Sequence, residues 1–136
     1  MAPIKKYGPG DRLYVRAQQV WLILVAHIMA KQKQRERWQE KLITYGDLAE
    51  RMGDDRRAAI GLGRELGIVG EYCIDNKLPA MNCIVVNQDD RKPGLGVVHR
   101  HGKSWDDEAR ATLEENWFQY RVPSTGTFRE VIHGEE

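Results

Sequence analysis

The segment from residue 11 to residue 31 has apolar side chains at the spacing of one long amphipathic helix. These side chains recur three or four positions apart, so they share one face of a helix. Gly8, Pro9 and Gly10 block extension towards the N-terminus, and Asp11 is a candidate cap. The segment therefore predicts a helix that the rest of the chain buries. Its apolar positions are Leu13, Ala17, Val20, Trp21, Leu24, Val25, Ile28 and Met29.

The apolar run inside this segment, residues 20–30, is interrupted by His27 and is shorter than the roughly 18 to 20 residues that span a bilayer. The first ten residues also lack a convincing signal-peptide cleavage site. We therefore expect a cytoplasmic protein without a membrane partner. A chain of 136 residues with 41% hydrophobic and 30% charged residues has the size and composition of one globular domain spanning residues 1–136.

A short helix is predicted over residues 45–52. Thr44 is a candidate N-cap, and Asp47 stands where an acidic side chain favours the positive end of the helix dipole. Gly53 follows as a C-terminal glycine.

A second helix is predicted to follow from about residue 55 to residue 76, with four glycines inside its helical pattern. Glycine weakens a helix interior by roughly 1 kcal/mol relative to alanine. We therefore expect a break near Gly67 or Gly70, and close approach of a neighbouring backbone where a glycine faces one.

Two extended segments, residues 82–86 and 97–101, flank a polar turn and predict a β-hairpin. Ser104 then caps a last helix over residues 104–118, whose first turn is acidic. The final segment, residues 119–136, is predicted to be an extended tail. It would dock three apolar side chains on the domain, namely those of Val122, Phe128 and Val131.

This order of elements predicts an α+β, mainly helical fold. A long N-terminal helix would precede a winged-helix-like core over residues 43–101, in which two helices are followed by a β-hairpin, and a C-terminal helix would follow. The second helix of such a core commonly enters a DNA groove while the hairpin contacts phosphates.

The charge of the chain is polarised although its net value is only +1. Residues 1–103 sum to +6, and residues 104–136 sum to −5. A basic surface for a polyanion fits this division. The acidic last third and the near-zero net charge instead favour a protein-interaction module, such as an inhibitor or a subunit of a larger assembly.

Four stretches resemble the C-terminal domain of alkylguanine-DNA alkyltransferases and the alkyltransferase-like proteins. They read ITYGDLAERMG, RRAAIGLGREL, LPAMNCIVVN and GLGVV, and together they cover about residues 42–98. The ITYGDLA element is the close match. The resemblance implies a DNA-binding domain whose partner is double-stranded DNA, either unmodified or modified.

The resemblance also implies roles for individual residues. Tyr45 inherits the position of the tyrosine that sits at the DNA backbone and assists nucleotide rotation in the family. The family's inserted arginine has no unambiguous counterpart, because counting from Tyr45 reaches Ala59 and a shift of two positions reaches Arg57. Phosphate contacts are expected from basic residues of the second helix and the hairpin tip. These are Arg56, Arg57, Arg64, Arg91 and Lys92.

The reactive centre of the family is not retained. The family has PCHR where this chain has MNCIVV, so Cys83 lies one position from the expected thiol and no histidine follows it. A thiol nucleophile needs a neighbouring base, because the thiolate is the reactive form. His99 and His101 share one face of the predicted strand without an evident third metal ligand. We therefore assign no catalytic residue, metal ligand or cofactor.

The hypothesis drawn from the sequence is a non-catalytic DNA-binding domain of the alkyltransferase-like type, which contacts the duplex through the helix after residue 55 and the basic hairpin tip. Two alternatives stay open. One is the protein-interaction module, and the other is a thiol enzyme that uses Cys83.

Overall fold

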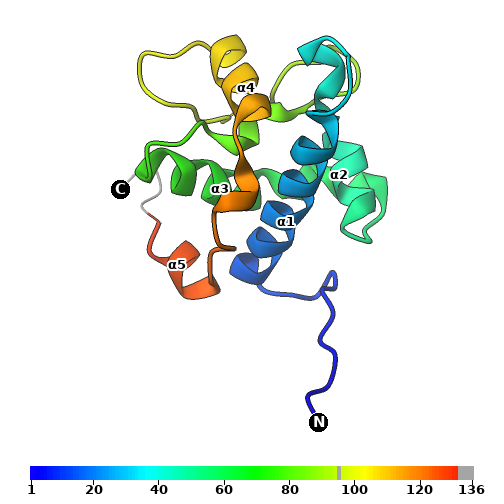
Figure 1. Cartoon of the computed structure of the whole chain (residues 1–136). Helices are drawn as coiled ribbons and strands as arrows, with labels where there is room; N and C mark the ends of the chain where they lie inside the picture. The colour runs from blue at the N-terminus through cyan, green and yellow to red at the C-terminus, as the bar shows by residue number, and fades with distance from the viewer. Residues whose placement is uncertain (95, 132–136) are drawn as a thin grey trace.

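Figure 1 shows the computed structural model of the chain, which describes residues 1–94 and 96–131. The fold is α+β and mainly helical, as predicted. The α-helices are α1 Leu13–Lys31, α2 Tyr45–Arg51, α3 Gly63–Asp75, α4 Trp105–Glu114 and α5 Thr125–Arg129. Short 3-10 helices are η1 Trp38–Lys41, η2 Arg56–Leu62, η3 Met81–Ile84 and η4 Trp117–Gln119. Two strands, β1 Ile43–Thr44 and β2 Val85–Val86, pair in parallel.

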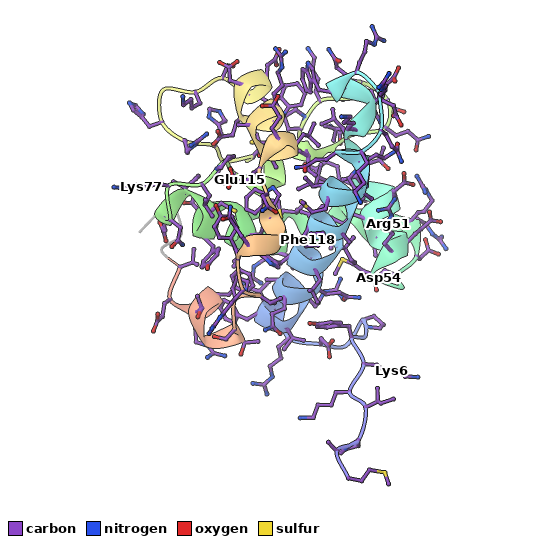
Figure 2. The ribbon with its side chains drawn as sticks, in the orientation of Figure 1. Lys6, Arg51, Asp54, Lys77, Glu115 and Phe118 are labelled. Carbon is purple, nitrogen blue, oxygen red and sulfur yellow. The ribbon has the colours of Figure 1, made fainter. Side chains whose placement is uncertain are left out.

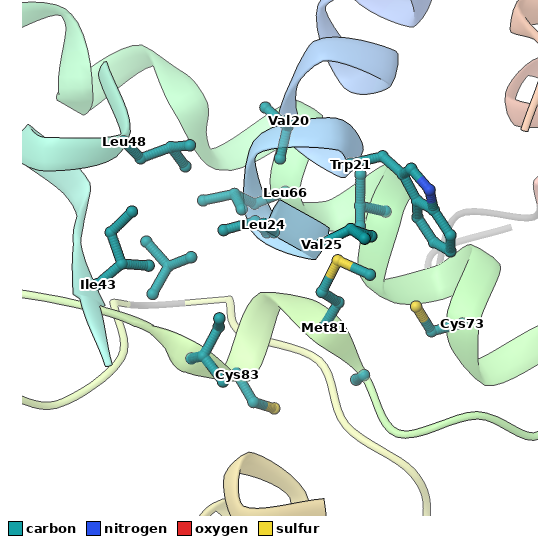
Figure 3. Close-up of a cluster of buried hydrophobic side chains, with 14 of the residues drawn as sticks. Val20, Trp21, Leu24, Val25, Ile43, Leu48, Leu66, Cys73, Met81 and Cys83 are labelled. Atoms are coloured by element: carbon teal, nitrogen blue, oxygen red, sulfur yellow. The ribbon is translucent and has the colours of Figure 1, made fainter. Parts of the chain in front are cut away.

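The predicted N-terminal helix is confirmed as α1, which runs through the middle of the molecule and packs on α3, α5 and η4 (Figure 1). Trp21 is its largest buried side chain, and it meets Tyr72 and Trp117 edge to face at ring-centroid distances of 5.6 and 5.7 Å. The core around it includes Leu24, and Figure 3 shows how α1, α3 and η3 contribute to it. Full burial of one such side chain is worth about 1.5 to 3 kcal/mol.

By length and composition alone, α1 would also fit a membrane span, with a mean hydropathy of 1.3 over its best window. Core helices pass the same test. Several of the large apolar side chains of α1, including Val20, Leu24 and Ile28, are completely buried against the rest of the chain. In total, 44% of this window is buried inside the structure.

The helix predicted over residues 45–52 is confirmed as α2. The hydroxyl oxygen of Thr44 accepts a hydrogen bond from the Asp47 backbone N–H at 3.1 Å, as the predicted N-cap requires. Gly53 adopts a φ of +87°, the left-handed conformation in which glycine lacks the penalty of a side chain. Both ends of α2 are therefore encoded locally.

The single helix predicted over residues 55–76 is wrong in its first half. The chain forms η2 first, and α3 begins only at Gly63. The break expected near Gly67 or Gly70 does not occur, because α3 continues to Asp75. A methyl group on Gly70 would collide with the side-chain amide of Asn82 and would lie 2.7 Å from a methyl carbon of Val98. Gly70 therefore permits close packing instead of ending the helix.

The predicted β-hairpin is also wrong, and β2 instead pairs with β1 in parallel, Ile43 opposite Val85. Residues 97–101 form no strand. The side-chain amide of Asn82, oriented to match its neighbours, exchanges two hydrogen bonds of 3.1 Å with the backbone N–H and carbonyl of Val98. The Cys83 thiol also donates to the Val98 carbonyl, at 3.4 Å. Side chains thus satisfy the backbone groups that a hairpin ladder would have used.

The C-terminal region differs from prediction in two places. Ser104 caps α4 as predicted. The helix ends at Glu114, earlier than predicted, because the backbone becomes extended at Glu115. The Trp117 indole N–H then donates to the Thr112 carbonyl at 2.8 Å.

The predicted extended tail contains α5, for which Ser124 is the N-cap. Phe128 and Val131 are buried as predicted, whereas Val122 is exposed. Residue 95 of the predicted hairpin and residues 132–136 of the tail lie outside the described residues.

Candidate nucleic-acid interface

Tyr45 begins α2 and extends its half-buried side chain to the loop that follows β2. Its phenolic oxygen accepts a hydrogen bond from the Gly94 backbone N–H at 2.9 Å. A methyl group on Gly94 would lie 2.8 Å from the same oxygen, which is closer than atoms pack. Glycine at this position therefore lets the loop close onto Tyr45.

Gly46 has a similar role for a different neighbour. The Arg56 guanidinium lies over the start of α2, and a methyl group on Gly46 would be 2.7 Å from one of its nitrogens. Arg56 donates to Asp47 at 2.9 Å and to Glu50 at 2.5 Å, and more weakly to Gln88 at 3.3 Å. The hydrogen bond from Arg56 holds the pKa of Asp47 below its usual value. The hydrogen bond of Tyr45 therefore joins α2 to the loop after β2. Gly46 leaves room for Arg56, whose ion pairs join α2 to η2.

These contacts leave a groove of about 290 Å³ between two walls. One wall is formed by η2 and the start of α3, and the other by the loop after β2. Tyr45 lies between the walls and also lines a smaller continuation along α3, past Gly63 and Gly67. The residues that line the groove are Tyr45, Ala59, Ile60, Gly63, Asn87 and Gly94.

Three of the predicted phosphate-binding residues have exposed side chains on the elements that form the two walls, although none of the three lines the groove itself. Arg57 lies on η2, Arg64 lies in the first turn of α3, and Lys92 lies on the opposite loop. Arg57 pairs with its near neighbour Asp55, at 3.2 Å. Among the described residues, Arg64 forms no ion pair. The structure therefore brings these three cations to the elements that border Tyr45.

The other two predicted residues are engaged in the fold. Arg56 bridges α2 and η2 through its carboxylate contacts. Arg91 has a left-handed φ of +57°, and its guanidinium donates to the Gln39 carbonyl at 2.7 Å. The bond from Arg91 joins the loop after β2 to η1. The segment is a loop and not the tip of the predicted hairpin, because residues 97–101 form no strand. Within the loop, the Asn87 N–H donates to the Lys92 carbonyl at 2.8 Å and closes a turn.

Acidic side chains also lie on these elements. Asp47 and Glu50 are on α2, Asp55 is beside η2, and Asp89 and Asp90 are on the loop. The described surface around the groove therefore carries both signs of charge, and its cations are separated by anions.

Several groove residues were not identified from the sequence as site residues. Gly94 has no side chain and Asn87 has a common amide side chain, so neither stands out in the sequence. Their place at the groove is seen only in the structure, where the loop closes onto Tyr45. Ile60 gave one signal, which is that it interrupts the apolar spacing of the predicted helix. Ala59, reached by counting from Tyr45, does line the groove.

Both thiols lie in the core. Burial raises the pKa of Cys73 to about 12 and raises the pKa of Cys83 further. The Cys83 thiol also donates a hydrogen bond, which favours its protonated form. His99 and His101 are exposed, and the described part of the chain contains no cluster of three or more metal-ligating side chains. These arrangements do not provide an activated thiol or a metal centre in the described residues.

Comparison of the chain with protein-family models, curated proteins and solved structures gave no match.

Proposed function

We propose that the protein binds double-stranded DNA through the face that carries the Tyr45 groove, without covalent chemistry. The observation that carries this proposal is the hydrogen bond between Tyr45 and Gly94. This bond joins the start of α2 to the loop after β2, which forms one wall of the groove. Lys92 lies on that loop, and Arg57 and Arg64 lie on η2 and in the first turn of α3, the elements of the other wall.

Two facing walls with exposed cations suit a nucleic-acid backbone, whose phosphates run along both sides of a groove. Neutralising phosphates releases condensed counterions, so the affinity would fall with increasing salt. The mixed charge around the groove limits non-specific attraction. It also requires the duplex to place its phosphates near Arg57, Arg64 and Lys92 and away from Asp89 and Asp90.

A second candidate function is protein interaction, which a separate surface supports. Phe118 in η4 is 69% exposed and Val122 just after it is 47% exposed. Exposed aromatic residues are common anchors at protein interfaces. In Figure 2, Phe118 lies beside α1, and the acidic α4 is close by in the sequence.

The test of DNA binding is a fluorescence-anisotropy titration of a labelled duplex at several salt concentrations. The variant Arg57→Gln/Arg64→Gln removes two cations from one wall of the groove. We expect weaker binding to all sequences and a salt slope that is smaller by roughly two. Both side chains are exposed, so the variant should retain its thermal stability.

The matched control is Lys77→Asn/Arg121→Gln, which removes the same charge elsewhere. Lys77 follows the C-terminal end of α3, and a 13-residue helix places it about 20 Å from Arg64. Asparagine tolerates the left-handed φ of +60° at position 77. Absence of duplex binding by the unaltered protein at micromolar concentration, or equal losses in the two variants, would exclude the proposed interface.

A further inference from the structure

Among the helices and strands of the described residues, Ile60 has the most exposed large apolar side chain, with 93% of its surface accessible. It belongs to η2 and lies at the edge of the Tyr45 groove. Nearby residues do not cover the Ile60 side chain. Gly61 and Gly63 have no side chains, and a Cβ atom added to either would meet nothing within 4 Å. By contrast, Leu62 in the same element is completely buried. The chain thus presents one branched aliphatic side chain outwards from a turn whose last residue, Leu62, is buried.

Two cations flank this side chain. Arg57 precedes Ile60 by three positions, and residues three apart lie on the same side of a 3-10 helix. Arg64 follows by four positions, in the first turn of α3. Both are exposed. An apolar side chain with an arginine on each side is complementary to a ligand that has an apolar centre and negative charges on both sides of it.

We propose that Ile60 inserts as a wedge between adjacent base pairs of the bound duplex, while Arg57 and Arg64 contact the flanking phosphates. This inference rests on the proposed DNA binding. Base pairs stack as apolar planes, and proteins that insert isoleucine, leucine or phenylalanine between them unstack one step and kink the duplex. Isoleucine is suited to this role because its branched side chain has few rotamers and keeps its shape.

A protein partner fits the same side chain less well. The other groove residues are glycines, Ala59, Asn87 and the half-buried Tyr45, so Ile60 is not part of a wide apolar patch. A protein hot spot needs a surrounding surface that excludes water. One inserted side chain is enough to separate two stacked base pairs. The DNA backbone on either side of them supplies phosphates for the two arginines. Insertion should favour flexible pyrimidine–purine steps, which unstack most readily.

The test uses the full chain and a duplex with a central TA step in which the adenine is replaced by 2-aminopurine, whose fluorescence rises on unstacking. A fluorescein label on the same duplex reports binding by anisotropy. We expect the unaltered protein to raise the 2-aminopurine fluorescence at saturation. Ile60→Ala should still saturate the duplex but lose most of this rise, whereas Ile60→Met should retain most of it.

Phe118→Ala is the matched control, because it truncates another exposed apolar side chain, on η4, and should leave the rise unchanged. If the unaltered protein gives no anisotropy change, the proposed DNA binding itself fails. If it binds without a rise in fluorescence, or if Ile60→Ala gives the full rise, DNA binding stands and the wedge is refuted. A loss in Phe118→Ala equal to that in Ile60→Ala would also refute it.

Discussion

Two arginines in this protein each bind two carboxylates, and their surroundings differ. Arg16 on α1 donates to Asp54 at 2.7 Å and to Glu65 at 3.1 Å, and all three side chains are at most 13% exposed. Arg56 on η2 donates to Asp47 and Glu50 at similar distances, but its side chain is 42% exposed. In Figure 2, Asp54 lies beside α1 on the right-hand side of the molecule.

The difference indicates what each cluster can do. Buried carboxylates depend on a buried cation for compensation of their charge, so the Arg16 cluster joins α1 and α3 to the turn that follows α2. Water competes for every member of the Arg56 cluster, so its ion pairs contribute little. The same chemical grouping is therefore buried in one place and exposed to water in the other.

The largest expected effect is that of Arg16→Met. This change leaves Asp54 and Glu65 buried without their cation, so the free energy of unfolding should fall by about 3 to 5 kcal/mol. Urea denaturation followed by circular dichroism measures the loss. The triple variant that adds Asp54→Asn and Glu65→Gln should recover part of the stability. A loss below about 1 kcal/mol would mean that the buried cluster behaves like an exposed one.

A third cluster, Arg100 with the completely buried Glu108, gives an intermediate case. Burial pushes the pKa of Glu108 upwards, but hydrogen bonds from Arg100 and from the Ala80 backbone outweigh it, and the net pKa is lowered. The resulting stability is present above the unfolded-state pKa of about 4.3 and is lost as the pH falls through the lower folded-state pKa.

We therefore expect Glu108→Gln to reduce the free energy of unfolding at neutral pH by about 1 to 3 kcal/mol. The variant should also show a weaker dependence of stability on acid than the unaltered protein. Urea titrations across the acid range measure both effects. Parallel pH profiles for the two proteins would contradict the lowered pKa of Glu108.

Tyr45→Phe should cost about 1 kcal/mol, because it removes the hydrogen bond with Gly94. Gly94→Ala introduces a methyl group close to the tyrosine oxygen, so its cost should be smaller when it is made in the Tyr45→Phe background. A double-mutant cycle by thermal unfolding measures this coupling. Strictly additive effects would show that the loop does not depend on the close contact.

Arg56→Met should have the smallest effect, a loss of no more than about 1 kcal/mol that diminishes with added salt. Denaturation of this variant beside Arg16→Met, at low and high salt, gives the direct contrast between the two clusters. An equal loss in both variants would remove the distinction between the buried and the exposed arginine.

The features predicted correctly from the sequence are those that depend on nearby residues. Thr44 and Ser104 cap their helices with hydrogen bonds that span three positions, and the apolar spacing of α1 follows from the geometry of a single helix. Such features can be predicted from the sequence without knowledge of the tertiary fold.

The failures depend on contacts between distant segments. The hairpin was predicted from β-branched residues, but the partner of Val98 is the side chain of Asn82. The expected break at Gly70 was read from helix propensity, whereas its neighbours are Asn82 and Val98. The same division applies to the elements around the candidate groove: the place of Tyr45 at the start of a helix follows from local pattern, but the carboxylates around Arg56 do not.

The parallel pairing of β1 with β2 has a consequence for the order of folding. Parallel strands cannot be joined by a tight turn, and the chain between β1 and β2 contains α2, η2 and α3. This long connection must be closed before the two strands can form their few hydrogen bonds. Contacts that close such a long loop form late. We therefore expect the walls of the Tyr45 groove to assemble after the helices around Trp21. Backbone amides of Thr44 and Val86 should exchange with solvent faster than those in the middle of α1.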